Sequence, residues 1–182
     1  MTGSVRDVAP AAEDVPLHRF WWLHDARWYQ GVARRFGQEA ANEINTEALR
    51  FVTRRVAAWC ARQHSRRPAD LPIDELFALL LQINLTIWPD DMVSVEHHHV
   101  GTTGDGADEW ETVVVNHFVP KMLRAARSAD GYRCASLEVR AGLYEGLGLS
   151  VEERHVECQF DGGEVCRFRT IRRPVPEGGH ER

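Results

Sequence analysis

The order of hydrophobic patterns along this chain predicts an α+β domain, in which N-terminal helices pack on an antiparallel sheet that ends in a closing C-terminal β-hairpin. Apolar residues recur at helical spacing through residues 17–87, whereas later segments alternate at strand spacing. A chain of 182 residues is long enough to bury the core of one domain. We therefore expect a single domain over residues 15–173, with flexible tails at residues 1–14 and 174–182.

Three helices are expected before the sheet. The first spans residues 17–36 and ends at Gly37. The second follows directly over residues 38–64, and after Pro68 we expect Asp70 to cap the third. The second helix has its apolar side chains on one stripe, composed of Ala41, Ile44, Ala48, Phe51, Val52, Val56 and Trp59. The third helix carries a stripe composed of Leu76, Leu79, Leu80 and Ile83.

Strands and two further helices are expected in the second half of the chain. Two strands come first, over residues 92–100 and 110–118, joined by a glycine-rich turn. They are followed by a short helix over residues 120–128, a longer helix over residues 134–147 and the closing hairpin over residues 151–172. Residues 161–163, Asp-Gly-Gly, supply the hairpin turn. In the longer helix, Gly142, Gly146 and Gly148 are spaced for close packing against a neighbouring helix.

The composition excludes several classes of protein. The formal net charge is −5 and the pI is near 6.0, so the chain lacks the basic surface that nucleic acid requires. No apolar run approaches the roughly 20 residues of a membrane span, and the first residues lack the apolar core of a signal peptide. We therefore expect a cytoplasmic protein that binds neither nucleic acid nor membrane and keeps its thiols reduced. A homodimer is left open.

Three of the four cysteines lie near the C-terminus with a histidine among them, in the pattern C-(x20)-H-V-E-C-(x7)-C. Thiolates and imidazoles are ligands that Zn²⁺ prefers, and four of them complete a tetrahedral site. The closing hairpin can bring two of the cysteines to one end of the sheet. The spacing is not that of a zinc ribbon or knuckle, so the pattern is as compatible with ordinary buried thiols as with a zinc site. Its ligands would be Cys134, His155, Cys158 and Cys166.

The segment over residues 134–169 resembles the C-terminal half of the vinyl-4-reductase domain, which also serves as the ligand sensor of phenol-responsive bacterial activators. In that family a cysteine opens a helix, a strand ends in E-x-x-C, and a short turn leads to C-x-F. Here His155 stands at the glutamate position, and the three cysteines match. The resemblance implies a vinyl-4-reductase-like fold with zinc held by these four residues.

A second cluster of polar and aromatic residues lies on the first two helices. The patterns W-x-x-H-D-A-R-W-Y at residues 21–29 and G-x-E-A-A-N-E-I-N at residues 37–45 resemble the opening of a bacterial family related to L-2-amino-thiazoline-4-carboxylic acid hydrolase. That resemblance implies a hydrolase-like protein acting on a small molecule. The residues alone allow another interpretation. The aromatic side chains of Trp21, Trp28 and Tyr29 would pack in the core, and Asp25 and Asn42 would form hydrogen bonds at the helix surface or between helices.

Three consecutive histidines occupy the first expected strand. Because side chains alternate along a strand, His97 and His99 face one side and His98 faces the other. His97 and His99 could bind a metal, or line a pocket with Glu111 or His117. The alternative is a strand end that faces solvent.

Two functions are compatible with these features. The first is a zinc-containing enzyme that acts on a small heterocyclic or amide-like metabolite by general acid–base catalysis, with Asp25 as base and His24 and Tyr29 assisting. An aspartate beside aromatic rings would lose solvation, which favours proton acceptance. The second is a vinyl-4-reductase-type module that binds or senses a small molecule beside a structural zinc ion. We favour the enzyme, because a sensor needs an output segment that one domain of this length does not provide.

Either function requires a pocket for a small molecule. We expect it between the N-terminal helices and the sheet, because pockets are mostly apolar with a few convergent polar groups. The residues expected to form it are Trp21, Trp28, Asn42, Trp88, His97 and His99.

Overall fold

The computed structural model describes residues 17–173 except residues 90 and 126. The chain folds in the order α1 (Leu17–Phe36), α2 (Gln38–Ala61), η2 (Pro68–Asp70, a 3-10 helix), α3 (Ile73–Ile87), β1 (Val93–Thr102), β2 (Asp108–His117), α4 (Phe118–Ala125), α5 (Ser136–Leu147), β3 (Val151–Glu157) and β4 (Cys166–Arg172). The α+β class is confirmed, and each expected helix and strand is present. The tails expected at residues 1–14 and 174–182 lie outside the described residues.

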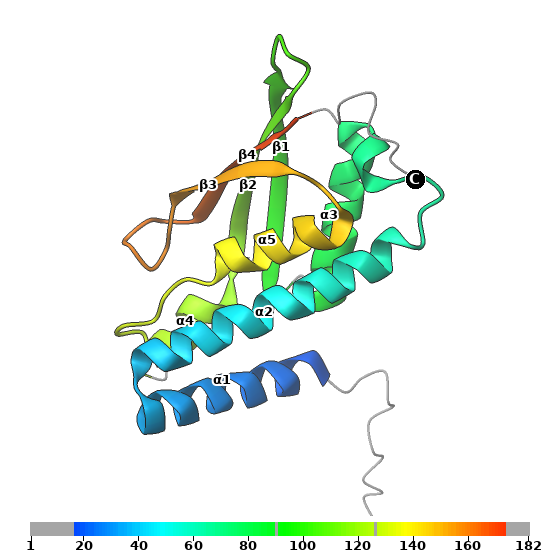
Figure 1. The fold of residues 1–182 in the computed structure, drawn as a ribbon. Helices are drawn as coiled ribbons and strands as arrows, with labels where there is room; N and C mark the ends of the chain where they lie inside the picture. The colour runs from blue at the N-terminus through cyan, green and yellow to red at the C-terminus, as the bar shows by residue number, and fades with distance from the viewer. Residues whose placement is uncertain (1–16, 90, 126, 174–182) are drawn as a thin grey trace, which may run out of the picture.

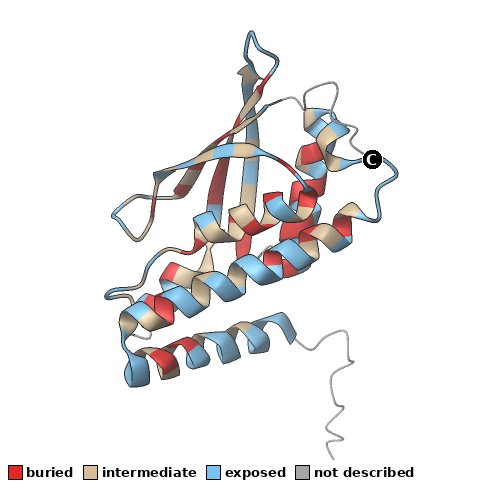
Figure 2. Cartoon of the chain, in the orientation of Figure 1, coloured by how far each residue is buried: buried red, intermediate tan, exposed pale blue. Residues whose placement is uncertain are grey.

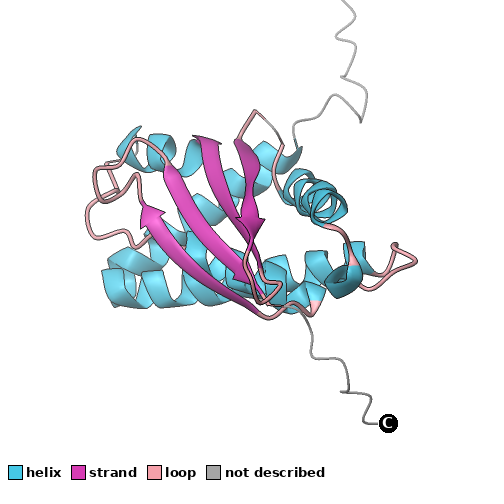
Figure 3. Cartoon of the chain, turned by 90° about the horizontal axis from the view of Figure 1, so that it is seen from above, coloured by secondary structure: helices cyan, strands magenta, loops and turns pink. Residues whose placement is uncertain are grey.

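The strands form one antiparallel sheet in the order β1-β2-β4-β3. β3 and β4 pair directly, so the closing hairpin is confirmed. Figure 1 shows the helices stacked outward from one face of the sheet, with α5 nearest, α2 next and α1 outermost. Seen from above in Figure 3, the strands lie in front of the helices, so the opposite face of the sheet carries no described helix. The sheet therefore contributes side chains to the space between sheet and helices from one of its two faces.

The two faces of the sheet differ in chemistry because side chains alternate along each strand. Facing the helices, Trp110, Thr112, Phe168 and Thr170 are fully buried. On the opposite face, arginines of β4 form ion pairs with glutamates of β2, namely Arg167 with Glu111 and Arg169 with Glu109.

Glycines on α5 allow this helix to lie directly against α2. A Cβ added at Gly142 would lie 2.3 Å from the carbonyl oxygen of Arg50, and one added at Gly146 would lie 2.3 Å from that of Arg54. No larger residue fits at these separations, so the expected packing role of these two glycines is confirmed. Gly148 has another role: it is the C-cap of α5, with a left-handed φ of 65°.

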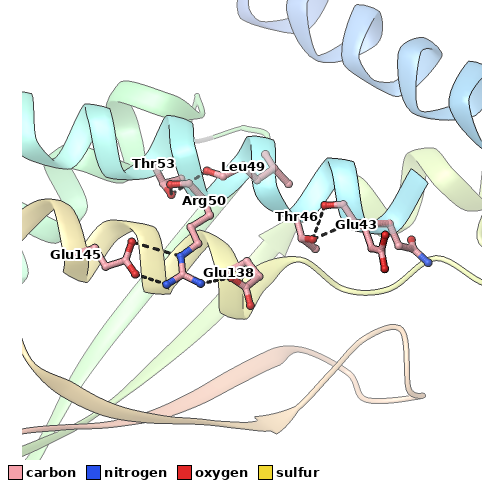
Figure 4. A network of polar contacts seen from close by, with 8 residues as sticks. Glu43, Thr46, Leu49, Arg50, Thr53, Glu138 and Glu145 are labelled. Carbon is pink, nitrogen blue, oxygen red and sulfur yellow. Dashed lines mark hydrogen bonds and ion pairs between the residues drawn. The ribbon is translucent and has the colours of Figure 1, made fainter. Parts of the chain in front are cut away.

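Charged side chains fix which faces of α2 and α5 meet. Figure 4 shows Arg50 of α2 reaching across to two glutamates of α5. Its Nη1 lies 2.9 Å from Glu138 Oε2, and its guanidinium also pairs with Glu145. All three side chains are partly exposed, so these pairs contribute little stability and mainly set the register.

Burial is greatest where α3 and α5 meet the sheet, as Figure 2 shows. The stripe expected on α3 is fully buried. The stripe expected on α2 is wrong, because its large members are exposed, namely Ile44, Phe51, Val52 and Trp59. The buried residues of α2 are instead Ala41, Asn42, Thr53, Ala57 and Cys60. The close approach of α5 leaves room only for small side chains on the inner face of α2.

Asp70 does not cap α3. It lies in η2, where its carboxylate accepts hydrogen bonds from Arg67, and Pro72 occupies the N-cap position of α3. None of the described helices has the length and hydrophobicity needed to cross a membrane. The cytoplasmic location and the homodimer remain predictions.

Candidate functional site

The four predicted zinc ligands converge at one end of the sheet from separate segments. Cys134 precedes α5, His155 lies in β3, Cys158 follows β3 and Cys166 begins β4. One donor atom from each residue lies within 4.8 Å of the other three. Zinc–sulfur bonds of about 2.3 Å in a tetrahedral site imply ligand separations of about 3.7 Å. Only small side-chain movements would therefore be needed to enclose a metal ion.

The chemistry of the cluster fits a metal ion. His155 Nε2 is buried and has no hydrogen-bond partner among the described residues. Its ring stacks on Phe168 with centroids 4.4 Å apart, which fixes its orientation. Leaving such a buried polar atom unpaired costs about 1–3 kcal/mol, and a metal–nitrogen bond would remove that cost. Three thiols and one imidazole are a donor set that zinc prefers.

The three thiols of the cluster differ in pKa because of their hydrogen bonds to one another and their burial. A hydrogen bond from Cys166 lowers the pKa of Cys134 to about 5. Hydrogen bonding to Cys134 in turn raises the pKa of Cys166. Burial raises the pKa of Cys158 to about 11. Cys134 therefore ionises first, and a bound cation would be needed to stabilise further thiolates.

The turn between β3 and β4 is held by local hydrogen bonds. Glu157 Oε1 accepts the backbone N–H of Glu164 at 2.8 Å, and the N–H of Gly163 donates to the Cys158 carbonyl at 2.8 Å. Gly162 adopts a left-handed φ of 93°, which the Asp-Gly-Gly sequence allows. These contacts place Cys158 and Cys166 on the same side of the hairpin.

A cavity of about 100 Å³ lies beside this cluster, between the inner face of the sheet and helices α2, α3 and α5. Its walls are mostly apolar, and Cys134 lines it, so the cavity borders the cysteine–histidine cluster. His117 also lines it and places Nδ1 3.9 Å from Cys166 Sγ. Burial lowers the pKa of His117 to about 4, so this ring is neutral at neutral pH.

His97 presents an unpaired polar atom at the cavity. Its Nδ1 lies 2.9 Å from Thr112 Oγ1, and its ring stacks on Phe77 at 5.2 Å. Burial, reinforced by the charge of Arg140, lowers the pKa of His97 to about 3. Because Arg140 donates to Thr112 Oγ1, the threonine hydroxyl hydrogen is available to His97 Nδ1, and the neutral ring then carries its proton on Nε2. That Nε2 is buried without a partner among the described residues.

A buried ion pair supports this wall of the cavity. Arg140 Nε donates to Glu153 Oε1 at 2.6 Å, and the two side chains are only 10% and 9% exposed. Tyr144 and Thr170 also donate to Glu153 Oε1, at 3.2 and 2.7 Å. Sequence reasoning missed this network. The feature of the sequence that could have indicated it is the spacing of Arg140 and Tyr144, which lie four residues apart and so share one face of a helix.

The polar cluster on α1 is directed away from the cavity. His24 and Asp25 are adjacent, with His24 Nδ1 3.2 Å from Asp25 Oδ1, and their side chains are 62% and 58% exposed. The loss of solvation expected for Asp25 is therefore absent. Trp21 and Trp28 are 60% and 55% exposed, so neither is a core aromatic. None of the four lines the cavity, and a catalytic role for Asp25 and His24 remains a prediction.

Trp22 is the tryptophan of α1 that reaches the cavity. It stacks on Trp88 with ring centroids 5.8 Å apart and an interplanar angle of 20°, and both line the cavity. Of the residues expected to form the pocket, Trp88 and His97 therefore meet at the cavity. His99 lies nearer the end of β1, where its Nε2 is 3.8 Å from Asp108 Oδ1. Glu111 faces the opposite side of the sheet.

Asn42 and Tyr29 act as interhelix hydrogen-bonding residues. The Tyr29 hydroxyl donates to Asn42 Oδ1 at 2.7 Å, and Asn42 Nδ2 donates to the Gly131 carbonyl at 2.8 Å. Asn42 Oδ1 also accepts the backbone N–H of Arg133 at 3.1 Å. Asn42 thereby ties both N-terminal helices to the segment that leads into Cys134.

Comparison with known structures shows where else this fold occurs. The phenol-responsive sensory domain of the transcription activator PoxR, solved with phenol, is similar with a TM-score of 0.56 and 15% identity, over 82% of this chain and 73% of that one. Subunit 3 of a trafficking protein particle complex from Naegleria fowleri, covalently bound to palmitic acid, is similar with a TM-score of 0.54 and 9% identity, over 86% and 95%. No family model and no curated protein matches the sequence. At these identities the likeness shows the fold alone.

Proposed function

We propose that this protein is a binding module for a small aromatic molecule that carries an oxygen, held in the cavity beside a structural zinc ion. The observation that carries the proposal is that Nε2 of His97, a residue of the cavity wall, is buried and finds no hydrogen-bond partner in the described part of the chain. Its N–H would donate to a phenolic or carbonyl oxygen of the ligand. A mostly apolar cavity with a few convergent polar groups is typical of small-molecule sites.

Size and fold support this choice of ligand. A volume of about 100 Å³ is close to that of engineered cavities of roughly 150 Å³ that bind benzene. The PoxR sensory domain, which has the same fold, was solved with phenol. The zinc ion would be held by Cys134, His155, Cys158 and Cys166, and four protein ligands leave no open position for chemistry. We therefore assign the metal a structural role next to the ligand.

The hydrolase-like enzyme predicted from the sequence would need a substrate to reach Asp25, His24 and Tyr29. None of these three residues lines the cavity: His24 is exposed, and Asp25 and Tyr29 line only the outer groove described below. The buried polar atom without a partner among the described residues belongs to His97, which does line the cavity. This contrast supports ligand binding over hydrolysis as the function to test first.

Calorimetry on the zinc-loaded protein, with phenol and benzene as probes, tests the proposal. We expect phenol to bind more tightly than benzene, because only phenol can pair with His97 Nε2. Replacing His97 with Phe should weaken phenol binding roughly 5- to 150-fold, the effect of losing about 1–3 kcal/mol at a buried polar group, and leave benzene binding nearly unchanged. His98→Phe is the matched control, because His98 is exposed. Equal affinity for both probes, or no binding of either, would contradict the proposal.

A further inference from the structure

We propose that an outer groove continues the cavity, and that the natural ligand is a longer amphipathic molecule with its apolar end in the cavity and an anionic group in the groove. This inference rests on the proposed function, because the cavity supplies the inner compartment. It extends that function by naming the shape and charge of the ligand.

The groove lies between α1, α2, α4 and residues 127–132, and has a volume of about 830 Å³. Four side chains line both the groove and the cavity: Trp22, Leu49, Val119 and Tyr132. Two spaces that share four lining residues adjoin one another. The groove therefore forms the approach to the cavity from the side of α1.

Aromatic rings form the boundary between the two spaces. Trp22 stacks on Trp88 and meets Phe118 edge-on, with ring centroids 5.8 Å apart in both pairs. Tyr132 packs against Tyr29 at 5.5 Å and against Phe160 at 4.7 Å. Flat, apolar side chains at such a boundary suit the passage of an alkyl chain or a ring.

The groove has unpaired positive charge. Three arginines line it, and none forms an ion pair with a described residue: Arg27, Arg34 and Arg127. Within the part of the chain that the structure describes, the polar partner of the Arg27 side chain is neutral: Arg27 Nη1 donates to Gln30 Oε1 at 3.1 Å. Two carboxylates, those of Asp25 and Asp130, line the same space, so the net charge is positive. The rest of the lining combines apolar side chains of α1, α2 and α4 with neutral polar ones such as Gln30, Gln38 and Asn45. An apolar lining with net positive charge complements an anion on an apolar chain.

Helix geometry sets the length of the ligand. Arg27 follows Trp22 by five residues and Arg34 follows it by twelve, which places them about 8 and 18 Å along the axis of α1. An anionic group must therefore lie at least one helical turn beyond the boundary before it meets a guanidinium. A short aromatic compound would fill the cavity and leave the groove to water.

A length series of probes tests the inference on the zinc-loaded full chain. The probes are ω-phenylalkanoic acids and the matched ω-phenylalkanols, measured by calorimetry and by displacement of a cavity-bound fluorinated phenol. Acids should bind more tightly than alcohols only above a threshold chain length. Arg27→Gln should weaken binding of intermediate acids and Arg34→Gln that of longer ones, each by roughly two- to fivefold, the value of an exposed ion pair. Binding of the alcohols should not change.

Arg35→Gln is the matched control, because Arg35 lies on the same helix but does not line the groove. Acids that bind no better than alcohols at every length, or that lose as much affinity in Arg35→Gln, would overturn the inference. So would arginine-dependent binding of acids that fails to displace the phenol, since the groove would then be a separate site. If phenol fails to bind while the length and arginine dependence hold, the amphipathic ligand is supported and the small aromatic ligand is rejected.

Discussion

His97 on β1 and Thr112 on β2 are joined by a 2.9 Å contact between Nδ1 and Oγ1, which holds the imidazole in place where His97 lines the cavity. Thr112 is itself held by Arg140, whose charge is balanced by Glu153. The polar atom that we assign to ligand recognition is therefore positioned by a chain of buried contacts that runs to β3. A ligand bound at His97 would contact a preorganised group.

The burial of His97 predicts a pH dependence of stability. Its folded pKa, about 3, lies below the unfolded value of 6.5, so the unfolded state binds more protons between these values. The contribution of His97 to the free energy of unfolding is fully present above pH 6.5 and is lost as the pH falls towards 3. His97→Phe should flatten the curve by about 1.4 kcal/mol per pH unit within that window. Urea unfolding at a series of pH values measures this, and parallel curves for the two proteins would contradict it.

Zinc should be structural. Protein purified without added metal should contain one zinc per chain, and Cys158→Ser should lose the metal. We expect the free energy of unfolding to fall by at least about 3 kcal/mol, which for a chain of this size is roughly 6–12 °C in Tm. Cys60→Ala is the control, because this buried thiol of α2 lies outside the cluster. Retention of zinc in Cys158→Ser, by elemental analysis, would exclude the assigned ligand set.

The ion pair of Arg140 and Glu153 should be costly to break. Glu153→Gln leaves the buried guanidinium without a compensating charge, and we expect a loss of about 3–5 kcal/mol in the free energy of unfolding. The double variant Arg140→Met with Glu153→Leu should be less destabilised than the single one, because no unpaired charge remains. Glu152→Gln, which affects only an exposed pair with Arg173, should lie within about 0.5 kcal/mol of wild type. A Glu153→Gln variant as stable as that control would refute the expectation.

Gly142 should not tolerate a side chain. Its added Cβ would meet the Arg50 carbonyl oxygen and Thr53 Oγ1, at 2.3 and 2.4 Å, and would push α5 away from α2. We expect Gly142→Ala to cost about 1–3 kcal/mol by overpacking. Gly104→Ala serves as the control, since a Cβ there meets no atom within 4 Å. Thermal unfolding of the two variants should differ clearly, and equal Tm values would show that the helices can separate without cost.

Structural features that depend on residues close together in the chain could be predicted from the sequence. The position of each helix and strand followed from apolar periodicity. The grouping of Cys134, His155, Cys158 and Cys166 followed from cysteine and histidine spacing together with a family resemblance. His97 and His99 were expected on one face of β1, and the structure places His97 at the cavity. Alternation and spacing are properties of the local chain, so tertiary contacts did not alter them.

Which faces of α1 and α2 turn inward was decided by tertiary structure, whereas the buried face of α3 was readable from its apolar stripe. On α1, Trp22 and Tyr29 face inward and Trp21 and Trp28 face solvent, although all four are aromatic. On α2, small residues are buried because the glycines of α5 bring the two backbones together. The network around Arg140 likewise joins α5 to β2, β3 and β4, which no spacing in the sequence relates. The sequence by itself determined the elements and the four cysteine and histidine residues that cluster at the end of the sheet. Only the packing of those elements decided where the cavity lies and which polar atoms face it, because that depends on contacts between residues far apart in the chain.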